Sequence, residues 1–178
     1  MKKINLIRGL AALDRHGVYV LTKSDIEKMF PDEQEKAMEK SLQRMVADGL
    51  LVRVVKGIYL NPAASSKNSW VVEHIAQCLR PGHFSYVSLE SMLSEYGVIS
   101  QVPLSRITVM TTGAKGTYHT SYGTIEFTHT KRRPMEIIER TVSVDGRPLR
   151  IASKDAAIKD LVRVGRNTNM IIPSELQE

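Results

Sequence analysis

The sequence predicts an α+β protein in which an N-terminal winged helix-turn-helix precedes a C-terminal mixed α/β domain with antiparallel strands. Three observations support this class. Apolar residues follow helical spacing up to about residue 47, a basic β-hairpin comes directly afterwards, and Thr-, Val- and Ile-rich strands begin near residue 106. We expect residues 1–62 to form the winged helix-turn-helix, 63–69 a linker, 70–166 the C-terminal domain, and 167–178 a flexible tail.

Two helices are expected before the first proline of the chain. Residues 3–16 place apolar side chains at helical spacing, and Gly17 can adopt the left-handed conformation that ends a helix. Thr22 or Ser24 can cap a second helix over residues 25–30, because a side-chain oxygen at that position satisfies a free backbone N–H. The proline that follows stops this helix.

A third, amphipathic helix follows, and Asp32 can cap it. Its apolar residues form a single stripe, which consists of Met38, Leu42, Met45 and Val46. A rotation of about 100° per residue puts a largely polar set on the opposite face, namely Lys36, Lys40, Gln43, Arg44 and Ala47. Gly49 marks the end of this helix. Residues 51–55 and 58–60 then read as a hairpin around Lys56-Gly57, with Arg53 and Lys56 as its basic side chains.

In the second half of the chain, the spacing of apolar residues changes from that of helices to that of strands. Helices are expected over residues 70–79 and, capped by Ser88, over residues 89–96. The expected strands are residues 106–112, 117–120, 124–130, 140–144 and 149–152, the last two paired around Asp145-Gly146. Ser153 caps a final helix that runs to about residue 164.

The composition favours a polyanionic partner and a reducing compartment. The formal net charge of +6 attracts polyanions such as nucleic acids, although many proteins of this charge bind none. A single cysteine excludes an intrachain disulfide. The basic N-terminus lacks a signal-peptide cleavage site, and no segment contains the roughly 20 apolar residues of a membrane span. We therefore expect a cytoplasmic protein that does not contact membranes.

The third helix and the hairpin are the candidate DNA-binding surface. A helix fits the major groove of B-DNA, where Gln and Arg can contact adenine and guanine edges and basic side chains can neutralise phosphates. The candidate contacts are Lys36, Lys40, Gln43, Arg44, Arg53 and Lys56. Two alternatives remain. Acidic residues on the same helix are also typical of a solvated surface, and winged helices can serve protein contacts instead.

Other motifs give weaker indications. Lys131-Arg132-Arg133 is a second candidate basic contact for phosphate or an acidic partner, or else a solvated turn. Glu126 with Lys131 allows a metal-dependent nuclease as an alternative function, but the tight acid-x-lysine spacing of such sites is missing. His74 and Cys78 supply half of a zinc site with no second pair. We therefore expect no catalytic residue, no metal and no cofactor.

The sequence resembles the AbiEi-type antitoxins of type IV toxin–antitoxin (abortive infection) systems over residues 6–164. The resemblance lies in the segments GLLVRVVKGIYLNP, YVSLESMLSEYGV, ITVMTTGAKGTYHTSYGTIEFTHTKR and RIASKDAAIKDLV. The first segment is shared with many regulators, whereas the SLES helix and the strands after it are more distinctive.

This resemblance implies a transcriptional autorepressor and antitoxin rather than an enzyme. The N-terminal domain would bind inverted repeats in double-stranded promoter DNA through the six candidate contacts. The C-terminal domain would counter a nucleotidyltransferase-like toxin without requiring a stable complex with it. The residues alone do not establish the antitoxin half, its active side chains or the oligomeric state, and a protein-binding adaptor remains an alternative.

Overall fold

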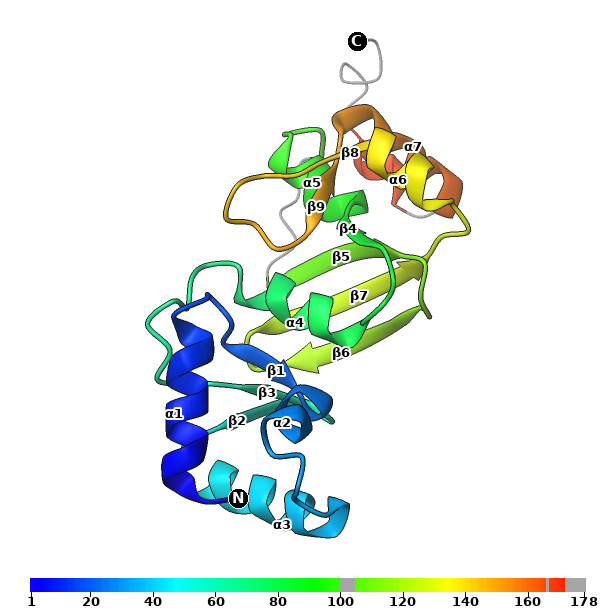
Figure 1. Cartoon of the computed structure of the whole chain (residues 1–178). Helices are drawn as coiled ribbons and strands as arrows, with labels where there is room; N and C mark the ends of the chain where they lie inside the picture. The colour runs from blue at the N-terminus through cyan, green and yellow to red at the C-terminus, as the bar shows by residue number, and fades with distance from the viewer. Residues whose placement is uncertain (100–104, 166, 172–178) are drawn as a thin grey trace. The chain divides into compact units, whose positions relative to one another are not determined.

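The computed structural model describes residues 1–99, 105–165 and 167–171, in which helices and strands mix as an α+β class requires (Figure 1). The chain divides into two compact units, Met1–Val71 and Val72–Glu178. In the described part of the chain, no helix is long and apolar enough to cross a bilayer. The expected fold class is thus confirmed at the level of mixed helices and strands.

The N-terminal unit follows the order helix, strand, helix, helix and hairpin. Its elements are α1 (Lys3–Asp14), β1 (Val20–Thr22), α2 (Lys23–Met29), α3 (Glu35–Ala47), β2 (Val52–Val55) and β3 (Ile58–Leu60). The strands form an antiparallel sheet in the order β1-β3-β2. The hairpin turn is where the sequence predicts it, since Gly57 adopts a φ of 81° between β2 and β3.

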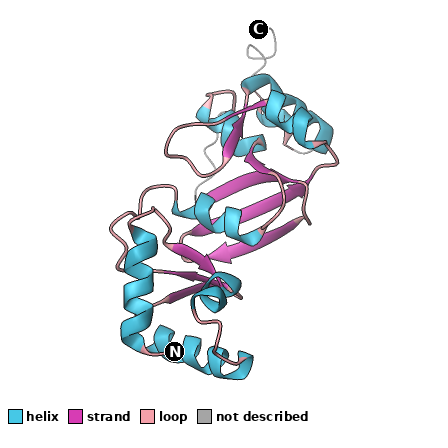
Figure 2. Ribbon diagram, viewed as in Figure 1, coloured by secondary structure: helices cyan, strands magenta, loops and turns pink. Residues whose placement is uncertain are grey.

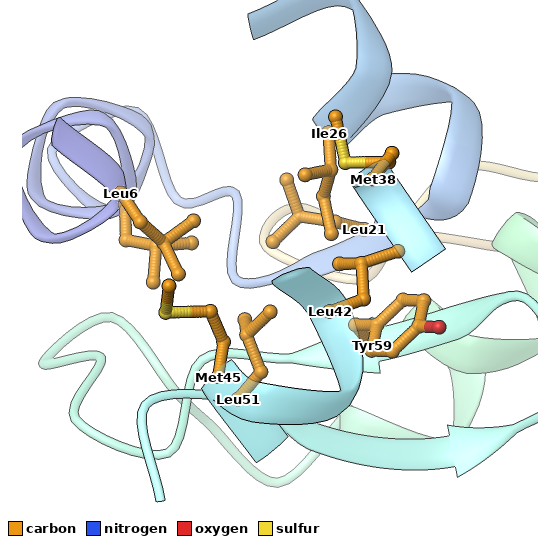
Figure 3. Packing of buried hydrophobic residues seen from close by; sticks show 9 residues of the cluster. Leu6, Leu21, Ile26, Met38, Leu42, Met45, Leu51 and Tyr59 are labelled. Atoms are coloured by element: carbon orange, nitrogen blue, oxygen red, sulfur yellow. The ribbon is translucent and has the colours of Figure 1, made fainter. Parts of the chain in front are cut away.

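A single apolar core holds these elements together (Figure 3). The three helices and strands β1 and β3 contribute to this core, and α3 inserts Met38, Leu42 and Met45. The other buried members are Leu6, Leu10, Leu21, Ile26, Leu51 and Tyr59. The predicted apolar stripe of the third helix is confirmed, with Val46 half-buried at its edge.

The helix caps agree with the sequence at α2 and differ at α3. Thr22 caps α2 in a reciprocal capping box with Asp25. The predicted cap of the third helix is wrong, because Gln34 occupies the N-cap position and makes no side-chain capping bond. Asp32 lies too early in the turn to reach the first free amides of a helix that begins at Glu35.

The segment predicted as a linker is fixed to α1 by hydrogen bonds. The Asp14 carboxylate accepts from the backbone N–H of Ser65 at 2.9 Å and of Ser66 at 3.0 Å, and also from both hydroxyls. The Asn68 side chain accepts from the Tyr19 hydroxyl at 3.2 Å. These bonds place residues 65–68 within the N-terminal unit.

The C-terminal unit contains a six-stranded sheet whose strands are interspersed with helices along the chain. Figure 2 distinguishes these helices and strands by colour. Its elements are α4 (Val71–Leu79), β4 (Ser85–Val87), α5 (Leu89–Glu95), β5 (Arg106–Thr111), β6 (Gly116–Thr120), β7 (Gly123–His129), α6 (Pro134–Glu139), β8 (Thr141–Val142), β9 (Arg150–Ala152), α7 (Lys154–Val164) and the short 3₁₀ helix η1 (Thr168–Met170). The sheet order is β6-β7-β5-β4-β9-β8.

The sheet is mixed, so the expectation of antiparallel strands is only partly right. The pairs β5–β7 and β4–β9 are parallel, and the remaining neighbours are antiparallel. The hairpin of β6 and β7 folds back so that β7 lies beside β5, which a strand-by-strand reading of the sequence does not reveal. The pairing of β8 with β9 is confirmed.

One further expectation requires correction. Ser88 precedes α5 but makes no capping bond, because its hydroxyl donates instead to the buried Asp160. In the segment predicted as a flexible tail, η1 covers Thr168–Met170 and Ile171 forms a β-bridge with Ile99. The rest of that tail, residues 172–178, lies outside the described residues. Ser153 does cap α7, as predicted.

Candidate functional site

The polar face of α3 is exposed as the sequence predicts. Lys36, Lys40, Gln43 and Arg44 all belong to the exposed class, whereas the apolar stripe on the other side of the helix is buried. The core therefore fixes the rotation of α3 and leaves these four side chains in solvent. The remaining question is whether the acidic residues of the same region neutralise them.

A single lysine on α2 holds three nearby carboxylates. The Lys23 Nζ lies 3.2 Å from Glu39, 3.5 Å from Glu27 and 3.7 Å from Glu35. The hydrogen bond to Glu39 raises the pKa of Lys23 above its ordinary value, against the opposing effect of burial. Exposed ion pairs of this kind add little stability. These ion pairs direct the side chains of Glu35 and Glu39 toward Lys23 of α2 and away from the basic face of α3.

The other two carboxylates of this region are also paired. Glu33 accepts hydrogen bonds from the N-terminal ammonium group and from the Ser41 hydroxyl, and these bonds lower the pKa of Glu33. Asp48 lies 2.9 Å from the Lys3 ammonium group. The acidic residues Glu33, Glu35, Glu39 and Asp48 therefore each have a cationic partner from outside the polar face of α3.

The basic face of α3 keeps its hydrogen-bonding groups open. Within the described residues, Lys36, Lys40 and Gln43 have no side-chain hydrogen bond or ion pair. Arg44 differs, since its Nη2 donates to the Met1 carbonyl at 3.1 Å. Three of the four predicted contacts on this helix are thus free to bind a ligand, and the fourth is anchored at one nitrogen.

The hairpin presents two more exposed cations. Arg53 lies on β2 opposite Tyr59, next to a register shift, and Lys56 occupies the turn. Neither side chain has a polar partner among the described residues. We use the name α3–hairpin face for the six exposed residues of this unit, which are Lys36, Lys40, Gln43, Arg44, Arg53 and Lys56.

The structure separates the three residues of the second basic run. Lys131 is exposed and without a partner in the described part of the chain, and Arg133 pairs with Glu136 at 3.3 Å. Arg132 is half-buried and lies 2.9 Å from Asp160. Sequence reasoning missed Arg140, which follows the run closely, and Asp160 and Arg163, which lie near it although they are distant along the chain.

Of the two alternative nuclease residues, Glu126 forms an ion pair with an arginine of a neighbouring strand, and Lys131 is exposed. Glu126 lies on β7 and accepts from Arg106 on β5 at 3.2 Å. Among residues 1–99, 105–165 and 167–171, no three His, Cys, Asp or Glu side chains cluster as a metal site would require.

Comparisons with known proteins place the chain in a family and support its fold. A model of the family described as "Family of unknown function (DUF6088)" matches residues 14–155. No curated protein matches. The crystal structure of the RV2827C protein from Mycobacterium tuberculosis is similar with a TM-score of 0.58 at 16% sequence identity. The similarity covers 97% of this chain but 64% of that one, so the chain spans somewhat less than two thirds of its length.

Proposed function

The chain belongs to the DUF6088 family, and on that premise we propose that its N-terminal unit is a winged helix-turn-helix that binds double-stranded DNA. The observation that carries this proposal is the charge distribution around α3. The acidic side chains are paired with cations outside the polar face, whereas Lys36, Lys40 and Gln43 remain unpaired among the described residues. The element order of the unit, with a β2–β3 hairpin after α3, supports the same assignment.

The dimensions of α3 suit the major groove. Its 13 residues span about 20 Å, and the groove of B-DNA is about 12 Å wide. Lys36 and Lys40 lie one helical turn apart, so both can reach phosphates along one edge of the groove. Gln43 belongs to the residue type that makes paired hydrogen bonds to adenine. Arg44, held at one nitrogen by the Met1 carbonyl, keeps further donors for a phosphate or guanine.

The hairpin would contact the backbone beside the groove. Arg53 and Lys56 are cations on a short, twisted element whose turn is fixed by the left-handed conformation of Gly57. Phosphate contacts of this kind set the register of a protein on DNA without reading the sequence. We therefore assign Gln43 to sequence recognition and the basic members of the α3–hairpin face mainly to affinity.

The regulatory role follows from the resemblance to AbiEi-type antitoxins. We infer that the chain represses its own promoter at inverted repeats and that its C-terminal unit counters a nucleotidyltransferase-like toxin without a required stable complex. The support is the order of the segments from the SLES helix to the EFTHTK strand, which form α5 to β7. Co-expression with the gene next to its own tests this role. Rescue of growth supports it, and continued growth arrest contradicts it.

The DNA-binding proposal is tested by anisotropy titration of a labelled promoter duplex over a range of salt concentrations. The variant K36Q/K40Q removes two exposed charges that have no partner among the described residues, so its fold should be unaffected. The slope of log K against log salt is negative, and each lost phosphate contact makes it shallower by about 0.9. We expect the slope of this variant to be less negative by about 1.8 for two contacts.

A matched control separates contact from net charge. Lys28 is equally exposed but lies on α2 beside Asp25, so K28Q changes the charge without touching the α3–hairpin face. Its slope should equal that of the unaltered protein. A second variant, Gln43→Ala, should reduce the preference for the promoter over random DNA and leave the slope unchanged. Equal losses in K36Q/K40Q and K28Q would show that this face is not the DNA contact.

A further inference from the structure

The C-terminal unit contains a pocket whose lining is almost entirely charged. Its volume is about 420 Å³, and its lining residues are Lys131, Arg132, Glu136, Arg140 and Arg163. The first two follow β7, the next two belong to α6 and the position after it, and the last lies on α7. Three chain segments thus bring four cations and one carboxylate to a single site.

Two of these cations, Arg132 and Arg140, form ion pairs with the fully buried carboxylate of Asp160. Asp160 has no exposed surface, and its Oδ1 lies 2.9 Å from Arg132 Nη1 and 3.1 Å from Arg140 Nη2. Its Oδ2 accepts hydrogen bonds from Tyr86 at 3.0 Å and from Ser88 at 2.8 Å. Burial, reinforced by the nearby Asp160 charge, raises the pKa of Tyr86, so this hydroxyl remains a donor.

This network orients the guanidinium groups without exhausting them. Each guanidinium carries five N–H donors. Arg132 Nη1 donates to the Thr130 hydroxyl at 3.4 Å and Arg140 Nη2 to the Ala156 carbonyl at 2.9 Å, which leaves other donors of both groups available. The buried Nε of Arg140 has no acceptor among the described residues. A preorganised guanidinium loses less side-chain entropy when it binds an anion than a freely rotating one. The guanidinium groups of the pocket are therefore preorganised by the fold, unlike the side chains of a cluster of freely rotating surface charges.

The remaining lining residues leave an excess of positive charge. Lys131 and Arg163 are exposed and have no ion pair within the described ranges. The single lining carboxylate, Glu136, accepts from the backbone N–H of Arg133 at 2.8 Å and from its guanidinium at 3.3 Å. Glu136 is thus engaged by Arg133, and the four lining cations outnumber this one lining carboxylate.

We propose that this pocket, formed by Lys131, Arg132, Arg140 and Arg163 over the buried Asp160, binds a chain of linked phosphate groups. Guanidinium groups match phosphate oxygens with paired hydrogen bonds, which favours phosphate over other anions. The volume lies in the range of small-molecule sites, about 300–1,000 Å³, and exceeds that of one oxyanion. The close grouping of four cations suits linked phosphates better than the spaced phosphates of a duplex.

The lining also defines what the pocket does not recognise. None of the described residues that line it is aromatic, and stacking on aromatic rings is a common way in which proteins hold nucleobases. The site should therefore bind inorganic tripolyphosphate and the triphosphate of any nucleotide with similar affinity. This site belongs to the C-terminal unit and is independent of the proposed DNA-binding face.

Isothermal titration of the full chain with inorganic tripolyphosphate, ATP, UTP and inorganic phosphate tests the proposal. The variant K131Q/R163Q removes the two lining cations that have no partner in the described part of the chain, so Asp160 keeps its network. We expect it to lose at least about tenfold in affinity for tripolyphosphate, since charge-assisted hydrogen bonds are the stronger ones. The control K115Q removes an exposed cation of the same unit that does not line the pocket and is not paired with any of the described residues that do.

The outcomes separate the possible sources of phosphate. Support requires similar binding of tripolyphosphate, ATP and UTP, weaker binding of single phosphate, and little effect of K115Q. A preference of more than about tenfold for one nucleotide would overturn the assignment to phosphate groups alone. Absence of tripolyphosphate binding, or equal losses in K115Q and K131Q/R163Q, would overturn the site. Promoter DNA should bind K131Q/R163Q as it binds the unaltered protein, and a loss there would assign the pocket to nucleic-acid phosphates.

Discussion

Replacement of Asp160 by alanine should destabilise the C-terminal unit severely while leaving the N-terminal unit intact. The fully buried carboxylate is the common partner of two guanidinium groups and two hydroxyl groups. Its removal leaves the charges of Arg132 and Arg140 without their buried counter-ion. Removal of one partner of a buried ion pair costs about 3–5 kcal/mol, because the remaining charge stays desolvated.

The expected change is large enough to be measured separately for each unit. In a unit of this size, each 1 kcal/mol lowers the melting temperature by about 4–8 °C, so the loss should be at least about 12 °C. Since two units need not unfold together, hydrogen exchange followed by mass spectrometry is the appropriate assay. Peptides from β4, β9 and α7 should lose protection, and peptides from α1 and α3 should not.

A control on the same helix isolates the effect of burial. Asp155 is exposed in the first turn of α7, where its carboxylate gains only the small benefit of the helix dipole, about 0.3–1 kcal/mol. Asp155→Ala should therefore change protection slightly. If Asp160→Ala were no more destabilising than Asp155→Ala, the network beneath the basic pocket would not stabilise this unit, and the reasoning would be refuted.

The remaining predictions concern the N-terminal unit. Hydrogen bonds from Ser66 and Ser65 hold the pKa of Asp14 well below its ordinary value of 3.8, so its contribution to stability is present above that value and is lost as the pH falls below it. The amide resonances of both serines should shift in that acidic range, and Asp14→Asn should abolish this dependence; unchanged titration in the variant would contradict the clamp. Gly57→Ala should lower the free energy of unfolding by about 1–2 kcal/mol, because Gly57 has a φ of 81° and a side chain is strained in this left-handed conformation. The melting temperature of this variant should fall below that of the Lys56→Ala variant.

The sequence predicted local features well because they depend on neighbouring residues. The helix with Met38, Leu42 and Met45 on one side follows from periodicity, and the hairpin follows from Gly57 in its turn. The pairing of the acidic residues with Lys23 and other cations could not be predicted, because those partners come from separate elements. This pairing changes the interpretation of α3 from a mixed surface to one with a distinct basic face.

The features that sequence reasoning missed depend on contacts between distant segments. The parallel pairing of β5 with β7 depends on where the β6–β7 hairpin docks. Ser88 does not cap α5 as expected for the same reason, since its hydroxyl donates to Asp160, which is 72 residues further along the chain. The basic pocket combines residues that follow β7 with Arg163 on α7, and only the tertiary fold shows that they share a site.

The central claim, that α3 and the hairpin bind DNA, is tested most directly by hydrogen exchange of the whole chain with and without a duplex from its own promoter. A bound duplex should slow exchange in Glu35–Ala47 and in the turn between β2 and β3, since these segments carry the α3–hairpin face. Exchange in β4 and β9 should stay unchanged. Protection confined to the C-terminal unit, or none at a saturating duplex concentration, would contradict the claim.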